Sequence, residues 1–153
     1  MKPIAITALS SFSPLGNQPE AIWAEYLKPT TLIQEKQIGT QKVKVAALPD
    51  VLLDQAKALR QSDNKYRALD SSVLYAILAA RQAIQQAGWN ENDVFGINIG
   101  SSRGATELFE QYHEEFITTG KTATLASPTT TMGNISSWVA HDLKAKGPEI
   151  SHS

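Results

Sequence analysis

Cysteine is missing from the 153 residues of this chain. Its absence excludes disulfides, cysteine-ligated zinc and thiol nucleophiles among these residues. Long apolar runs are missing too, and no stretch approaches the roughly 20 residues that a membrane-spanning helix needs. Pro3 and the polar Thr7, Ser10 and Ser11 leave the N-terminal apolar stretch too short for a signal peptide. We therefore expect a cytoplasmic protein without a membrane partner.

Positively and negatively charged residues are also nearly balanced. The chain has 14 Lys and Arg against 15 Asp and Glu, with no run of like charge, so we expect no nucleic-acid partner. We expect the binding partners to be small molecules or other proteins. The three histidines, His113, His141 and His152, do not have the spacing of metal ligands, so we expect no metal site.

What is present is an alternation of strand-like and helix-like segments. Short apolar runs rich in β-branched residues predict strands at 3–9, 43–48 and 94–100. Residues 28–42 and 49–66 are interpreted as surface excursions, the second partly helical. The alternation predicts an α/β fold with a mostly parallel sheet flanked by helices. Without repeats or a low-complexity linker, residues 1–153 are expected to form one domain.

The clearest helix signal lies in residues 70–88. Val73, Ile77 and Ile84 recur at the spacing of one helical face. Asp70 or Ser71 is suited to cap the start of this helix, and Gly88 to end it. Further helices are predicted in "PEAIWAEYL", "ATELFEQYHEEFITTG" and "GNISSWVAHDLKA".

A glycine-containing turn joins the strand at 94–100 to the helix that follows. Gly96, Gly100 and Gly104 are spaced by four, which matches neither the dinucleotide fingerprint nor the P-loop. Close packing of the strand against its helix explains these glycines better than nucleotide binding does. Arg103 lies in the turn, where it either meets an anion or is a solvated loop residue.

Four segments in order resemble the N-terminal part of the β-ketoacyl-[acyl-carrier-protein] synthases, condensing enzymes of the thiolase superfamily. They are "IAITALSSFSPLGNQPEAIWAEYL", "YRALDSSVLYAILAARQAIQQAG", "GINIGSSRGATE" and "SPTTTMGNISSWVAHDLKAKGPEISHS". The resemblance implies the N-terminal half of a thiolase-like fold, with the C-terminal half outside residues 1–153. The first strand departs from the family, which often has a T-G-x-G step where this chain has Thr7, Ala8, Leu9 and Ser10.

The resemblance also implies an activity for the parent protein. Ketosynthases are acyltransferases of fatty acid or polyketide-like biosynthesis, and they condense an acyl thioester with a malonyl thioester on acyl carrier protein. In the family the strand after Gly-Pro leads to the nucleophilic cysteine, and two histidines come much later. All three would lie beyond Ser153, so we expect no catalytic residue in this chain and no activity from it alone. No cofactor is implied.

Site residues follow from the same resemblance. Gly100, Arg103, Thr129, Thr130 and Thr131 are candidates for the acyl pocket. Glu149, Ile150, Ser151, His152 and Ser153 are candidates for a strand that pairs across a homodimer axis. The hydroxyls of the threonine segment also suit helix capping and turns. Two alternatives stay open: a non-catalytic partner subunit of the chain-length-factor kind, and a stand-alone α/β ligand-binding domain.

Overall fold

The computed structural model describes residues 3–153. Six α-helices, four strands and one 3₁₀ helix are assigned in this range. In chain order they are α1 (Pro19–Tyr26), β1 (Ile33–Ile38), β2 (Gln41–Ala46), α2 (Asp50–Ser62), η1 (Asn64–Tyr66), α3 (Ser71–Ala87), β3 (Ile97–Gly100), α4 (Thr106–Thr119), α5 (Ala126–Thr130), α6 (Gly133–Leu143) and β4 (Glu149–His152).

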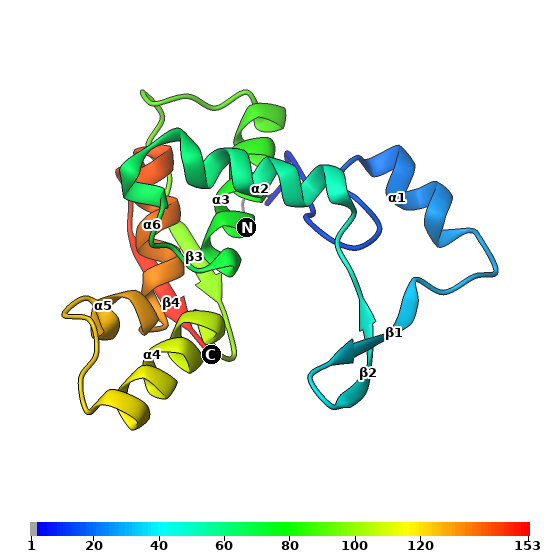
Figure 1. Ribbon diagram of the computed structural model, residues 1–153. Helices are drawn as coiled ribbons and strands as arrows, with labels where there is room; N and C mark the ends of the chain where they lie inside the picture. Colours follow the sequence, from blue (N-terminus) through cyan, green and yellow to red (C-terminus); the bar gives the residue numbers. More distant parts are fainter. Residues whose placement is uncertain (1–2) are drawn as a thin grey trace.

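The α/β fold class predicted from the sequence is confirmed, with two small sheets. β3 and β4 are parallel, with Ile97 opposite Glu149 and Gly100 opposite His152. β1 and β2 form an antiparallel hairpin, which lies apart from the helices in Figure 1. One sheet is therefore parallel and the other antiparallel. β2 overlaps the strand predicted at 43–48, whereas β1 lies in residues 28–42, for which the sequence predicts a surface excursion and no strand.

The helix predicted over 70–88 is α3, and it forms the centre of the core. The Asp70 carboxylate accepts a hydrogen bond from the Ser72 amide (2.8 Å), and Gly88 ends the helix in the left-handed conformation. Both predicted boundaries are confirmed. The core cluster joins α3 to α2, η1 and α6, and its buried members are Leu59, Tyr66, Leu69, Val73, Leu74, Ile77, Ile135 and Val139.

One face of the parallel pair β3–β4 rests on this core. Ile97 and Ile99 pack against the cluster, and Ser151 faces α6. Asn98, Gly100, Ile150 and His152 alternate with them and lie on the opposite, exposed face. Ser151 and His152 therefore point to opposite sides of the sheet.

The strand predicted at 3–9 is wrong. Residues 3–9 pair with no strand among the described residues, and their apolar side chains are exposed, Ile4 at 94% and Ile6 at 79%. β-branched residues favour an extended backbone, but a strand also needs a neighbour for its backbone hydrogen bonds. The strand predicted at 94–100 is shorter than expected for the same reason, because pairing with β4 covers only Ile97–Gly100.

Within residues 3–153, none of the helices has both the length and the apolar character needed to cross a membrane.

Candidate functional site

The candidate site lies where the parallel strands β3 and β4 end. Gly100 is the last residue of β3, and His152 lies opposite it at the end of β4. The loop 101–105 then leads into α4, and the Ser101 amide donates to the His152 carbonyl (2.9 Å). In open α/β folds the carboxyl ends of parallel strands are where ligands bind, because the chain diverges there.

Gly100 leaves room for the imidazole of His152. A Cβ atom added at Gly100 would lie 3.0 Å from Cε1 of His152 and 3.4 Å from its Nδ1. The histidine ring therefore covers the glycine on the exposed face of the sheet. A side chain at position 100 would push the ring by a few tenths of an ångström.

The turn after β3 is fixed by Gly104. Its φ of +66° is in the left-handed region, which favours glycine, and it is fully enclosed. The Gly104 amide donates to Oγ of Ser101 (2.9 Å). A Cβ at Gly104 would lie 3.6 Å from Cα of Met132 and 3.7 Å from the Thr131 carbonyl oxygen. The turn thus packs against the threonine segment.

An open pocket of about 410 Å³ lies beside this turn, lined by Arg103, Thr106, Phe109, Glu110 and Thr130. Two of the five predicted pocket residues, Arg103 and Thr130, are thus brought together. Within residues 3–153, no carboxylate lies within ion-pair distance of Arg103. An exposed guanidinium beside an aromatic ring and a hydroxyl can receive a polar or π-rich ligand.

The other predicted pocket residues do not line this pocket. Gly100 lies under His152, and Thr131 approaches Gly104 through its backbone. The Thr129 hydroxyl donates to the Leu125 carbonyl (2.6 Å) and the Thr130 hydroxyl to the Ala126 carbonyl (2.7 Å). The predicted capping role is not observed, because neither α5 nor α6 begins with a side-chain cap. The Thr129 and Thr130 hydroxyls instead bond to carbonyls four residues earlier, and Thr130 also lines the pocket.

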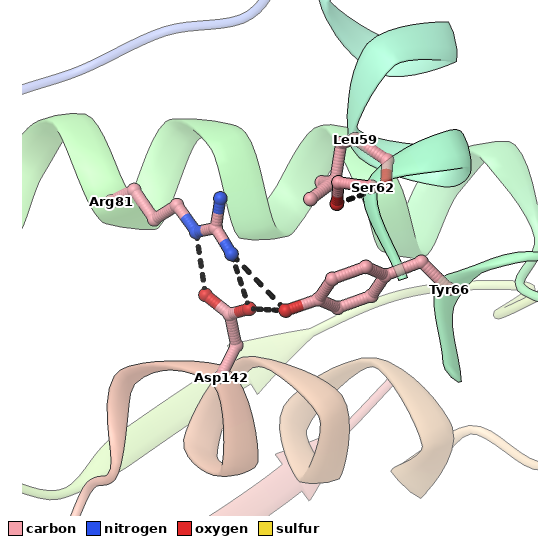
Figure 2. Close-up of polar contacts among 5 residues, drawn as sticks. All are labelled: Leu59, Ser62, Tyr66, Arg81 and Asp142. Carbon is pink, nitrogen blue, oxygen red and sulfur yellow. Dashed lines mark hydrogen bonds and ion pairs between the residues drawn. The ribbon is translucent and has the colours of Figure 1, made fainter. Parts of the chain in front are cut away.

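A partly buried polar network is not evident from the sequence pattern. Asp142 on α6 accepts hydrogen bonds from the Tyr66 hydroxyl (2.6 Å) and from Nη2 and Nε of Arg81 (2.7 and 2.8 Å). Figure 2 shows Arg81 reaching from α3 and Tyr66 from η1 to the same carboxylate. We call Tyr66, Arg81 and Asp142 the polar brace. The Asp142 side chain is only 1% exposed, so its charge depends on these two donors.

The brace sets the ionisation of its members. Burial acts to raise the pKa of Asp142, but the hydrogen bonds from Arg81 and Tyr66 outweigh burial and hold that pKa below its usual value. Burial and the hydrogen bond to Asp142 raise the pKa of Tyr66. The hydrogen bond to Asp142 likewise raises the pKa of Arg81.

A sequence signal for the brace existed. An aspartate in the last turn of a helix is disfavoured by the helix dipole, so a specific partner is needed there. Arg81 is also the one charged residue in the largely apolar stretch 73–84.

Among the described residues, His113 and His141 form no ion pair. His113 stacks on Phe109 with ring centroids 6.2 Å apart, and His141 contacts Trp138 edge to face at 5.7 Å. Within residues 3–153, no three His, Asp or Glu side chains are grouped to hold a metal ion.

These features define an α/β protein with an open pocket near the carboxyl end of a parallel strand pair. Among solved structures, the ishigamide ketosynthase/chain length factor aligns with 97% of the chain at a TM-score of 0.73 and 18% identity. A β-ketoacyl synthase from Burkholderia phymatum STM815 aligns with 99% of it at 0.73 and 17% identity. The fold is therefore that of the thiolase-like ketosynthases.

The chain belongs to the β-ketoacyl synthase family, whose N-terminal domain matches residues 1–153. It is 31% identical over 158 residues to 3-oxoacyl-[acyl-carrier-protein] synthase 2 of Staphylococcus aureus (strain COL), covering 96% of this chain and 37% of that protein. The synthase 2 of Coxiella burnetii is 28% identical over 161 residues, with 97% and 37% covered. The chain thus spans 37% of the length of these curated relatives.

Proposed function

We propose that this chain is the N-terminal part of a 3-oxoacyl-[acyl-carrier-protein] synthase. The parent protein would condense an acyl thioester with malonyl carrier protein, with loss of carbon dioxide. The observation that carries this proposal is the match of the whole chain to the family's N-terminal domain, and the names of its relatives support it. Acyl carrier protein and its acyl and malonyl thioesters are the proposed partners, and a cytoplasmic location is part of the proposal.

Residues 1–153 alone are proposed to be inactive. Condensation on a ketosynthase starts when a thiolate takes the acyl group, and this sequence contains no cysteine. No covalent acyl intermediate on sulfur can therefore form on this chain. The proposed nucleophile would follow β4, the strand that ends at the candidate site.

The experiment compares residues 1–153 with the longer parent protein. Each is incubated with acyl and malonyl carrier thioesters, and 3-oxoacyl products are measured by mass spectrometry. We expect turnover by the parent protein and none by residues 1–153. Turnover by residues 1–153 would refute the proposed inactivity, and a parent protein without turnover would refute the proposed activity.

The pocket supports an acyl substrate that is not a plain alkyl chain. Arg103 and Glu110 are charged and lie beside Phe109 in the lining. Covering a charged group with an alkyl chain costs free energy unless the charge is paired. We propose that the parent protein accepts a polar, aromatic or polyunsaturated acyl group, or that Arg103 swings out as a gate.

Replacing Arg103 by Ile tests this pocket assignment. The variant should shift acyl preference in the parent protein toward plain alkyl chains. Lys121→Ile removes an exposed cation just beyond α4, away from the pocket lining, and serves as the matched control. An acyl-chain profile that Arg103→Ile leaves unchanged would contradict both forms of the pocket proposal.

We also propose that β4 pairs across a homodimer axis. Among the described residues β4 has β3 as its one strand neighbour, which leaves its other edge open, and Ile150 is 53% exposed. An open strand edge is prone to pair with another chain. Ile150→Lys should therefore convert a dimer of the parent protein to a monomer in sedimentation experiments. Ile38→Lys on the hairpin, where Ile38 is 56% exposed, should not.

A second candidate is a non-catalytic partner subunit of the chain-length-factor kind. One structural neighbour is described as a ketosynthase/chain length factor, and its fold is compatible with either role. The two candidates differ in the parent sequence. A cysteine in the turn that follows β4, together with two later histidines, supports the enzyme, and the lack of that cysteine supports the partner subunit.

A further inference from the structure

The polar brace holds the C-terminal end of α6. Asp142 is next to the last residue of α6, and its hydrogen bonds reach α3 through Arg81 and η1 through Tyr66. These three residues are 15 to 76 positions apart in the sequence. The brace therefore ties three separate elements at one point.

A second set of hydrogen bonds holds β4 to the first half of the same helix. Ser136 is fully buried, and its Oγ lies 2.9 Å from Oε1 of Glu149 and within hydrogen-bond distance of Oγ of Ser151. The Ser137 hydroxyl donates to the same Glu149 oxygen (2.7 Å). Ser136 and Asp142 are six positions apart, about 9 Å along a helix. α6 therefore connects the brace to β4 as one rigid piece.

Apolar packing alone would leave the rotation of α6 loosely defined. Its contact with α3 involves Val139, Ile135 and the small side chains Ala76 and Ala80. Apolar contacts are not directional, whereas an Arg–carboxylate pair with two parallel hydrogen bonds is. Buried ion pairs add little net stability over apolar residues of equal size, and their best-attested use is to fix register.

We propose that Tyr66, Arg81 and Asp142 are positioning residues that fix the rotation of α6 and thereby the place of β4. The consequence for catalysis rests on the proposed function, in which the nucleophile follows β4. The brace would then hold the nucleophile without touching substrate.

The test uses the parent protein with the triple variant Tyr66→Phe/Arg81→Met/Asp142→Leu, which replaces all three polar groups by apolar ones and buries no charge. The matched control is Glu91→Gln, which removes the exposed ion pair at Lys144, just after α6. Three quantities are measured: the thermal midpoint, hydrogen exchange of residues 147–153, and the kcat and KM of nucleophile acylation.

We expect the triple variant to keep a thermal midpoint close to that of the wild type. Exchange in residues 147–153 should become about tenfold faster while exchange in α2 stays unchanged. The kcat of acylation should fall by roughly tenfold to a hundredfold without a change in KM, because a displaced nucleophile binds substrate but reacts slowly. The control should match the wild type in all three.

Each other outcome counts against the proposal. Native exchange at 147–153 in the triple variant overturns it, and so does faster exchange throughout the protein with a lowered midpoint, which indicates a purely structural role. Faster exchange at 147–153 with native kcat overturns the catalytic consequence. If the wild-type parent shows no acylation, the proposed function fails, and the exchange measurement decides the positioning role by itself.

Discussion

Residues 3–46 and residues 50–152 differ sharply in burial. We call the first segment, which contains α1 and the β1–β2 hairpin, the N-terminal arm. None of its residues is buried, although it carries large apolar side chains such as Trp23 (63% exposed) and Ile6 (79%). All of the buried residues within 3–153 lie in the second segment. Apolar composition therefore does not decide burial, which depends on whether a partner surface is in place.

The arm nevertheless contacts the rest of the molecule at one place. The Ser10 hydroxyl donates to the Ala79 carbonyl (2.6 Å), and the Gln82 side chain donates to the Asn17 carbonyl (2.7 Å). Phe12 stacks on Tyr75 with ring centroids 5.1 Å apart. All three contacts fall on α3, so residues 10–17 are anchored while α1 and the hairpin extend outward (Figure 1).

The largest difference in stability between the two regions should come from replacing an isoleucine by alanine in each. Ile77 is 0% exposed in the centre of α3, and Ile4 is 94% exposed in the arm. Ile77→Ala should lower the free energy of unfolding by about 2–5 kcal/mol, because it leaves a cavity in the core. Ile4→Ala should change it by less than about 0.5 kcal/mol. Urea unfolding followed by circular dichroism measures both, and equal losses would contradict the division into two regions.

A helix cap should give the next largest effect. Asp70 is 3% exposed, and it accepts hydrogen bonds from the amides of Ser72 in α3 and Leu108 in α4. Asp70→Ala should cost about 2–3 kcal/mol, because it removes a cap and leaves the partly buried Leu108 amide without its acceptor. Gln18 at the start of α1 makes no capping hydrogen bond, so Gln18→Ala should change stability by less than about 0.5 kcal/mol. Denaturant midpoints compare the two, and a loss at Gln18 as large as at Asp70 would contradict the cap assignment.

The features that the sequence could predict are local ones. The start of α3 at Asp70, its end at Gly88 and its buried Val73 and Ile77 depend on residues within a few turns of one another. The turn with Arg103 was predicted for the same reason, because a strand, glycines and a helix follow one another directly.

The features that it could not predict depend on distant partners. The segment 3–9 has a strand-like sequence, but no local pattern tells whether a neighbouring strand is present. Asp142 and Tyr66 are 76 positions apart, so their contact follows from how α6 packs on α3 and η1. β1 was missed because polar residues on an exposed hairpin lack the apolar run that marks a strand.

Acid should weaken the core region through Asp142. Because the pKa of Asp142 is lowered in the folded state, its ionised form stabilises the fold above the unfolded pKa of about 3.9. This contribution is lost as the pH falls below about 4 and through the lower, folded pKa. Urea midpoints at pH 6 and pH 3 should therefore differ less in Asp142→Asn than in the wild type. An equal pH dependence in both proteins would show that other carboxylates account for the loss.

The smallest effect should come from an ion pair of similar length in the arm. Nζ of Lys42 lies 2.9 Å from Oε1 of Glu35 on the hairpin, against 2.7 Å between Arg81 and Asp142. The Lys42 and Glu35 side chains are 71% and 55% exposed, so water screens the pair and competes for both groups. Lys42→Gln should change the free energy of unfolding by less than about 0.5 kcal/mol, with no dependence on salt beyond that of the wild type. Urea unfolding of the parent protein measures this change. A larger loss would mean that the hairpin packs against a surface outside residues 3–153. The contrast in burial between the two regions would then hold for this segment and not for the parent protein.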